Sequence, residues 1–184
     1  NALFSGNLDE LQIYDKYLTE EQIFQIYNKT LATKPAKLVI NATIPIIELT
    51  PINLLNNTSF NGTLNINGTL NINSTEIITP QVNVTNKLTV TAWIKPDYST
   101  ASDEMTIVSK EKSFVLSINN ILEPVHIAKF SVFDGLKWTD ITGLDKIEST
   151  SHLAAVINGT NISLYVNGTL QNSRSLKDTF AVSE

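Results

Sequence analysis

The residues best suited to chemistry are two acidic groups, Asp9-Glu10 followed by Asp15, and Asp103-Glu104. Hydrolysis of a glycosidic bond uses two carboxylates that flank the substrate, one as acid and the other as base or nucleophile. Successive side chains on a strand point to opposite faces, so adjacent acids such as Asp9 and Glu10 diverge. Neither group has the alternating spacing that places two acids on one face. The sequence therefore predicts that the chain is not an enzyme.

Neither of the two histidines supports a catalytic role. His126 lies between Val125 and Ile127 in a predicted strand, and His152 begins the apolar run Leu153–Ile157. A catalytic triad needs a serine or cysteine nucleophile that the histidine can activate. No such motif accompanies either histidine, so we predict hydrogen-bonded structural roles for both.

Composition excludes several other classes of function. The 184 residues are 42% hydrophobic, which is enough for one core, and the net charge is −5 with a pI near 5.0. Lysine and arginine do not cluster, so we predict neither a nucleic-acid partner nor a membrane surface. No apolar run is long enough to predict membrane insertion. The absence of cysteine excludes disulfides and thiolate metal sites, and two histidines cannot form a His-rich metal site.

The pattern Asn-x-Ser/Thr, which accepts N-linked glycans, is unusually frequent. It occurs eleven times, whereas chance at this composition gives about four or five. Some matches are also typical of hairpin turns. The excess predicts an extracellular or cell-surface protein with N-linked glycans, and the acceptor residues are Asn28, Asn41, Asn56, Asn57, Asn61, Asn67, Asn73, Asn83, Asn158, Asn161 and Asn167.

The first residues read as a strand followed by a short helix. Leu11 and Ile13 alternate with polar residues, which predicts a strand. Thr19 is placed to cap a helix over Glu20–Asn28, and Gln22 completes a capping box. A helix this short is stable only when it packs on a partner surface.

Apolar residues at the start of this helix predict which face is buried. Leu18 and Ile23 have the spacing of a hydrophobic staple, and Ile23, Ile26 and Tyr27 form one stripe. We therefore expect the helix to dock through this stripe.

The rest of the sequence predicts strands. Residues 30–60 contain Pro35, Pro45 and Pro51 and are predicted to be an extended connector. Residues 61–78 hold a short repeat with apolar residues at even positions. From residue 80 onward, alternating apolar runs and the turns Asn158-Gly and Asn167-Gly predict a β-sandwich.

Several of these segments together resemble the successive strands of a laminin-G-like, concanavalin A-like jelly-roll domain. They follow one another in the family's order: Leu88-Thr-Val-Thr-Ala-Trp-Ile-Lys-Pro96, Thr106–Lys110, Phe114–Ile118, Asp134–Trp138 and Ser151–Gly168. The N-terminal residues Phe4–Tyr14 and Leu18–Ile23 are similar to the closing strand and terminal helix of the same family. In the family these elements come last, so the order here is permuted.

The resemblance implies an all-β jelly-roll β-sandwich with one short helix near the N-terminus and an extended connector. Residues 1–29 would be the closing strand and terminal helix, 30–60 the connector, and 61–184 a sandwich body without its last strand. The closing segment could belong to a preceding domain of a tandem array, close its own sandwich, or complete a neighbouring copy. A sandwich that lacks a strand exposes an edge, and a partner strand satisfies it.

Of these arrangements we expect complementation between successive units, because joining Glu184 to Asn1 restores nearly the family's order. The partners would be neighbouring copies or adjacent domains of the same chain. The residues expected to complete the sandwich are Leu8, Leu11, Ile13, Tyr14, Ile23, Ile26 and Tyr27.

The resemblance also implies ligands at the rim of the sandwich. Domains of this family often bind calcium through loop carboxylates, and Asp9 and Asp134 are the candidates here. Asn61 replaces the acid of the family's Phe-Asp-Gly turn. Both candidates could instead stabilise turns. For glycan binding, Trp138 beside Asp134 is the candidate surface anchor, whereas we expect Trp93 to be packed.

Two functions follow. The first is an extracellular structural or adhesive repeat of a cell-surface or filament-forming glycoprotein, with units joined by β-strand complementation. The alternative is a carbohydrate-binding, lectin-like module that could depend on calcium.

Overall fold

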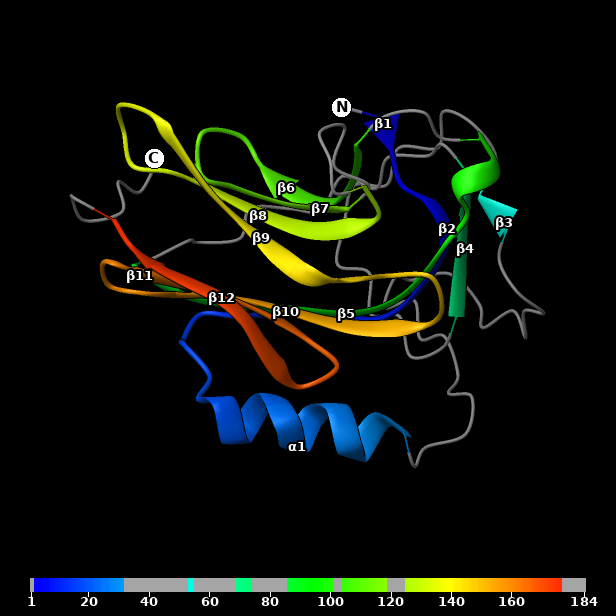
Figure 1. Cartoon of the computed structure of the whole chain (residues 1–184), viewed down its shortest axis with the longest axis horizontal. Coiled ribbons are helices and arrows are strands. Elements are labelled where there is room, and N and C mark those ends of the chain that lie inside the picture. The colour runs from blue at the N-terminus through cyan, green and yellow to red at the C-terminus, as the bar shows by residue number, and fades with distance from the viewer. Residues whose placement is uncertain are drawn as a thin grey trace, which may run out of the picture.

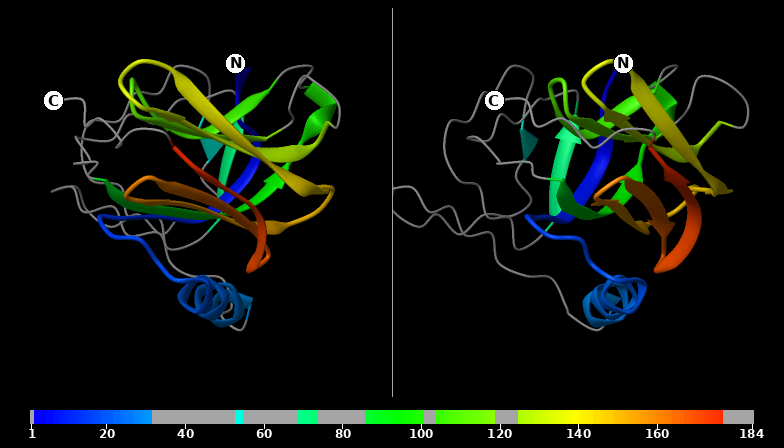
Figure 2. Two further views of the ribbon diagram at one scale, coloured as in Figure 1. Left: turned by 60° about the vertical axis from the view of Figure 1, so that its left-hand side comes forward. Right: turned by 90° about the vertical axis from the view of Figure 1, so that its left-hand side faces the viewer.

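The structure is a computed structural model that describes residues 2–31, 53–54, 69–73, 86–100, 104–118 and 125–176. Two β-sheets lie face to face, and one helix lies on the outer side of one sheet (Figure 1, Figure 2). The predicted all-β sandwich with one N-terminal helix is therefore confirmed. The described part contains no helix long and apolar enough to cross a membrane.

The smaller sheet has five strands, and all pairings are antiparallel except that between its first two strands. Its order is β1 (Ala2–Leu3), β6 (Met105–Lys110), β7 (Phe114–Ile118), β8 (Ile127–Phe133), β9 (Trp138–Lys146). The larger sheet has seven strands, in the order β12 (Thr169–Ser175), β11 (Asn161–Val166), β10 (Ser151–Asn158), β5 (Lys87–Pro96), β2 (Ser5–Tyr14), β4 (Thr69–Asn73), β3 (Asn53–Leu54). A 3₁₀ turn, Tyr98–Thr100, follows β5.

The core lies between the sheets and is built by strand alternation. Every second residue of β5 and of β7 points inward, because side chains alternate between the faces of a strand. These inward residues are almost completely buried, as the sequence predicted: Leu88, Val90, Ala92, Ile94, Phe114, Leu116 and Ile118.

Both predicted Asn-Gly turns are confirmed. Gly159, Asn167 and Gly168 have positive φ angles of 62°, 50° and 76°, the left-handed conformation that tight hairpin turns require. These turns join β10, β11 and β12 into the predicted meander.

The N-terminal strand β2 closes the sheet of its own chain. It pairs antiparallel with β5, where Leu8 lies opposite Ile94, and with β4 on its other side. A bulge between Asp9 and Gln12 shifts the register, so that Leu11 and Ile13 also pack against the core. Of the three arrangements left open by the sequence, the structure has closure within one chain. The predicted connector, residues 30–60, lies outside the described residues apart from residues 30–31 and β3.

The helix α1 (Glu20–Leu31) begins as predicted and runs three residues further than predicted. The Thr19 N–H donates to Gln22 Oε1 at 3.0 Å and the Gln22 N–H donates to Thr19 Oγ1 at 3.3 Å, which is the expected capping box. Leu18 and Ile23 are buried together in one cluster, as a hydrophobic staple requires. The capping box and the hydrophobic staple predicted for the start of this helix are therefore both present.

This helix packs on the outer face of the seven-stranded sheet. Its buried stripe contacts Ala154 and Val156 of β10 and Tyr165 of β11. The turn that leads into the helix is tied to β5, because Thr89 Oγ1 accepts the Leu18 N–H at 2.8 Å and donates to the Lys16 carbonyl at 2.9 Å. The N-terminal segment is thus held by a strand pairing, a packed helix and a buried hydroxyl.

Candidate functional site

The outer face of the five-stranded sheet is the opposite surface of the sandwich from α1 (Figure 2). Lys129 lies between Ala128 and Phe130, which point into the core, so its own side chain points outward. Its strand pairs with β9, where Ser131 lies opposite Asp140 and Phe133 opposite Trp138. We call this surface the open face and define it by six outward-facing residues of β7, β8 and β9. They are Ser117, Lys129, Ser131, Phe133, Trp138 and Asp140.

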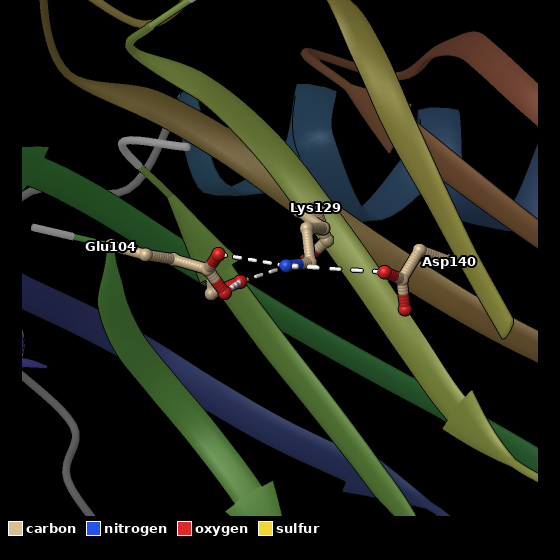
Figure 3. A network of polar contacts seen from close by, with 4 residues as sticks. Glu104, Lys129 and Asp140 are labelled. Atoms are coloured by element: carbon tan, nitrogen blue, oxygen red, sulfur yellow. Dashed lines mark hydrogen bonds and ion pairs between the residues drawn. The ribbon is translucent and has the colours of Figure 1, made fainter. Parts of the chain in front are cut away.

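A charged network crosses the open face (Figure 3). Lys129 Nζ lies 2.7 Å from Glu104 Oε2 and 4.0 Å from Asp140 Oδ2. Ser117 Oγ donates to Glu104 Oε1 at 2.7 Å. Each oxygen of the Glu104 carboxylate therefore has a partner, while Asp140 is held only by a longer ion pair.

Exposure separates these charges into a largely buried pair and an exposed carboxylate. The side chains of Glu104 and Lys129 are 5% and 19% exposed, whereas that of Asp140 is 49% exposed. The first two charges neutralise each other under partial burial, where ion pairing is much stronger than in water. The network then presents one net negative charge to solvent, at Asp140.

An aromatic pair lies beside this carboxylate. Trp138 is 44% exposed, and its ring centroid lies 5.3 Å from that of Phe133 at an interplanar angle of 49°. Trp138 and Asp140 are two residues apart on β9 and so share a face. Phe133 packs against one side of the tryptophan ring. The open face thus combines a braced aromatic surface with a carboxylate that can accept hydrogen bonds from hydroxyl groups.

Asp134, the predicted partner of Trp138, lies in the β8–β9 turn. Its Oδ1 accepts the backbone N–H groups of Leu136 at 2.9 Å and Lys137 at 2.8 Å. Both hydrogen bonds lower the pKa of the Asp134 carboxyl, and the one from Lys137 has the larger effect. The side chain is buried, so it stabilises the turn that presents Trp138. The structure offers Asp140 as the exposed acid beside the tryptophan.

The two calcium candidates belong to different sheets. Asp9 lies in β2 opposite Trp93, next to the bulge, whereas Asp134 follows β8. Among the described residues, no three His, Cys, Asp or Glu side chains gather in a way that could hold a metal ion. Calcium binding stays a prediction.

The remaining acids are also dispersed. Glu10 lies at the bulge with a φ of 47°, and burial, with a smaller effect of Asp9, raises the pKa of its carboxyl. Asp103 lies outside the described residues, and Glu104 belongs to the network of the open face.

The two histidines have different surroundings. His152 is 1% exposed and lies beside Trp93 and Tyr27, with ring centroids 5.4 and 6.1 Å away. Burial lowers the pKa of His152 to about 4. His126 was predicted inside a strand, which is wrong: it precedes β8 with a φ of 62°. Its ring stacks on Tyr98 at 3.8 Å and its Nδ1 lies 2.9 Å from Glu148 Oε1.

Trp93 is packed, as expected, but not in the main core. Tyr27 of α1 stacks on it at 5.6 Å with an angle of 24°. The helix therefore provides a second layer over the outer face of β5.

The sequence matches the model of a known protein family. The model of a laminin-G-like family, described as the concanavalin A-like lectin/glucanases superfamily, matches residues 66–183, more than half of the chain. The chain belongs to this superfamily. The match to the concanavalin A-like model includes every strand from β5 to β12 and leaves out β2 and α1. No curated protein and no solved structure matches the chain.

Membership of this superfamily indicates a general class of function. Laminin-G-like and concanavalin A-like domains are typically extracellular modules for adhesion or binding, and they are usually not enzymes. The family of this chain therefore indicates an adhesive or lectin-like module.

Proposed function

We propose that this chain is an extracellular, non-catalytic binding module that recognises carbohydrate through its open face. The observation that carries the proposal is the exposed pair Trp138 and Asp140 on one face of β9, with Phe133 behind the tryptophan. A sugar ring has an apolar face that stacks on an aromatic ring and hydroxyl groups that a carboxylate binds.

The charge of the site selects among glycans. Lys129 is neutralised by Glu104 at 2.7 Å, so the network carries one net negative charge, at Asp140. An anionic sugar would meet a like charge across a partly desolvated surface, which is unfavourable. Neutral or amine-bearing sugars fit this face better than sialylated or sulfated ones.

The same network argues for binding without hydrolysis. Glycosidases keep one carboxyl available as acid and another as base or nucleophile. Both oxygens of Glu104 are engaged, by Lys129 and Ser117, and its side chain is only 5% exposed. Asp140 would then act alone. We expect no hydrolysis of any glycan that the module binds, measured as release of reducing sugar over a day.

A glycan array tests the proposal directly. Probed with and without calcium, the wild-type chain should bind a set of neutral or amine-bearing glycans. Trp138→Ala and Asp140→Ala should each lower binding at least tenfold, which corresponds to about 1.4 kcal/mol. Leu144→Ala is the matched control, because Leu144 is an exposed apolar residue of the same strand. Unchanged binding by both site variants would contradict the proposal.

A second candidate is a repeat unit of a cell-surface or filament-forming glycoprotein, with units joined by exchange of the N-terminal segment. The favouring observation is that β2 lies inside the sheet, between β5 and β4, while α1 is separated from β5 by more than fifty residues. A neighbour's β2 could occupy the same place with the same pairings.

Cysteine pairs distinguish closure from exchange. Asn7 and Lys95 are paired across β2 and β5, and the chain has no cysteine of its own. Paired residues of neighbouring strands lie within the Cα separation that a disulfide spans. An Asn7→Cys/Lys95→Cys variant that oxidises only to monomers supports closure within one chain. Covalent dimers or ladders at the same concentration would support exchange.

A further inference from the structure

The predicted glycosylation sequons are distributed unevenly along the sequence. None of the eleven lies between residues 84 and 157, the stretch that includes β6, β7, β8 and β9. Five acceptor asparagines fall in described elements or turns: Asn28, Asn73, Asn158, Asn161 and Asn167. Each belongs to α1, to a strand of the seven-stranded sheet or to a turn between such strands. The four long strands of the five-stranded sheet therefore carry none.

Two of these asparagines are well placed to hold an oligosaccharide in the folded chain. Asn28 is exposed on the last turns of α1, and Asn158 is exposed where β10 ends in the turn at Gly159. Asn161 is the cross-strand partner of Asn158, and its Oδ1 accepts a hydrogen bond from Ser175 Oγ at 2.6 Å. A glycan on Asn158 would crowd Asn161, whose side chain is already engaged.

Asn167 is exposed, but its side chain is part of the fold. Its Oδ1 accepts the buried His152 N–H at 2.9 Å, and its own N–H donates to the His152 carbonyl at 2.8 Å. The following residue, Gly168, lies so close to α1 that a Cβ there would come within 2.9 Å of Phe24 Cδ2. An oligosaccharide on Nδ2 of Asn167 would leave the Oδ1 hydrogen bond in place but would have to fit beside this closely packed turn, next to α1.

We propose that Asn28 and Asn158 carry N-linked oligosaccharides, that Asn161 and Asn167 do not, and that the two glycans, placed away from the long strands of the five-stranded sheet, leave the open face accessible to its ligand. The last part rests on the proposed function. In the transfer step, Nδ2 of asparagine forms a bond to C1 of the sugar of a polyprenyl-diphosphate-linked oligosaccharide. The bond from C1 to the diphosphate oxygen breaks, the lipid diphosphate leaves, and Nδ2 loses one proton.

Mapping of the modified residues tests the first part. The chain secreted from glycosylating cells is treated with an amidase that converts each glycosylated asparagine to aspartate in ¹⁸O-water, and peptides are then sequenced by mass spectrometry. We expect the label at Asn28 and Asn158 only among the four sites. Unlabelled Asn28 or Asn158, or label at Asn161 or Asn167, would overturn this part. Asn28→Gln should remove one glycan from the intact mass and leave the fold unchanged.

A new sequon tests the second part. Lys137 is exposed immediately before β9, and Lys137→Asn creates the sequence Asn-Trp-Thr with Trp138 and Thr139. Lys137→Gln is the matched control, because it removes the same charge without creating a sequon. We expect the glycosylated Lys137→Asn protein to bind the best array glycan at least tenfold more weakly than Lys137→Gln.

The two parts fail separately. If glycosylated Lys137→Asn binds as tightly as the control, the open face is not the ligand surface, and the proposed function fails with it. The glycan map of Asn28 and Asn158 is then unaffected. If the map fails while the Lys137→Asn glycan blocks binding, the proposed function stands without the proposed glycans at Asn28 and Asn158.

Discussion

The two outer faces of this sandwich have opposite chemistry. On the seven-stranded sheet, Ile23 of α1 is completely buried against Val156 and its neighbours. On the five-stranded sheet, Trp138 and Asp140 remain almost half exposed. One face closes the fold by burying apolar surface, and the other keeps polar and aromatic groups available to a partner. Because the two sets of residues lie on opposite faces, we expect that substitutions can alter stability and recognition separately.

The largest change in stability should come from the helix-covered face. Ile23→Ala removes a fully buried side chain from the contact between α1 and β10, and such truncations cost about 2–5 kcal/mol. The free energy of unfolding in urea measures this. Gln25→Ala, on the exposed side of the same helix, should change it by about 0.5 kcal/mol or less. If Ile23→Ala and Gln25→Ala lowered the free energy of unfolding by equally small amounts, the packing of α1 on the sheet would not contribute to stability.

Acidification should lower the free energy of unfolding through His152, which is buried on the helix-covered face. The pKa of His152 is about 4 in the folded chain against an ordinary value of 6.5, because burial disfavours the charged ring. Between pH 6.5 and 4 the unfolded chain binds a proton that the folded chain does not, so stability falls by about 3 kcal/mol over this range.

His152→Phe isolates this contribution, because it keeps an aromatic ring beside Trp93 and Tyr27 but cannot be protonated. Unfolding free energies of both proteins are measured from pH 7 to 4. We expect the wild type to lose more stability on acidification than the variant does. Parallel pH profiles would contradict the assignment of this loss to His152.

A smaller effect is expected on the open face. Glu104→Gln removes the charge that pairs with Lys129 and should cost about 2 kcal/mol, because Lys129 is partly buried and has Asp140 as a second, more distant partner. A double-mutant cycle with Lys129→Met measures the coupling through unfolding free energies. A coupling energy near zero would mean that the ion pair does not stabilise the sheet.

Local sequence patterns predicted much of the helix-covered face. The capping box of Thr19 and Gln22 and the staple of Leu18 and Ile23 depend only on neighbouring residues, and both are present. The Asn167-Gly turn is similarly local. The docking of Tyr27 on Trp93 could not be predicted in this way, because the two residues are distant in sequence and the sequence does not specify which surface the helix covers.

The charged network of the open face was not predicted for the same reason. Glu104, Lys129 and Asp140 come from three different segments, and only the pairing of β6, β7, β8 and β9 brings them together. Alternation between Ala128 and Phe130 does place Lys129 outward, which is a usable signal. The turn role of Asp134 was one of the alternatives that the sequence left open, and its hydrogen bonds favour it.

The smallest effect on stability should accompany the largest effect on binding. Trp138→Ala removes an exposed ring whose truncation we expect to lower the free energy of unfolding by about 0.5 kcal/mol or less. The most direct test is the dissociation constant of this variant for the best array glycan, measured beside that of the wild type. If the open face binds the glycan, this variant should bind at least tenfold more weakly than the wild type, with an unchanged free energy of unfolding. Wild-type affinity in a folded Trp138→Ala protein would contradict this prediction.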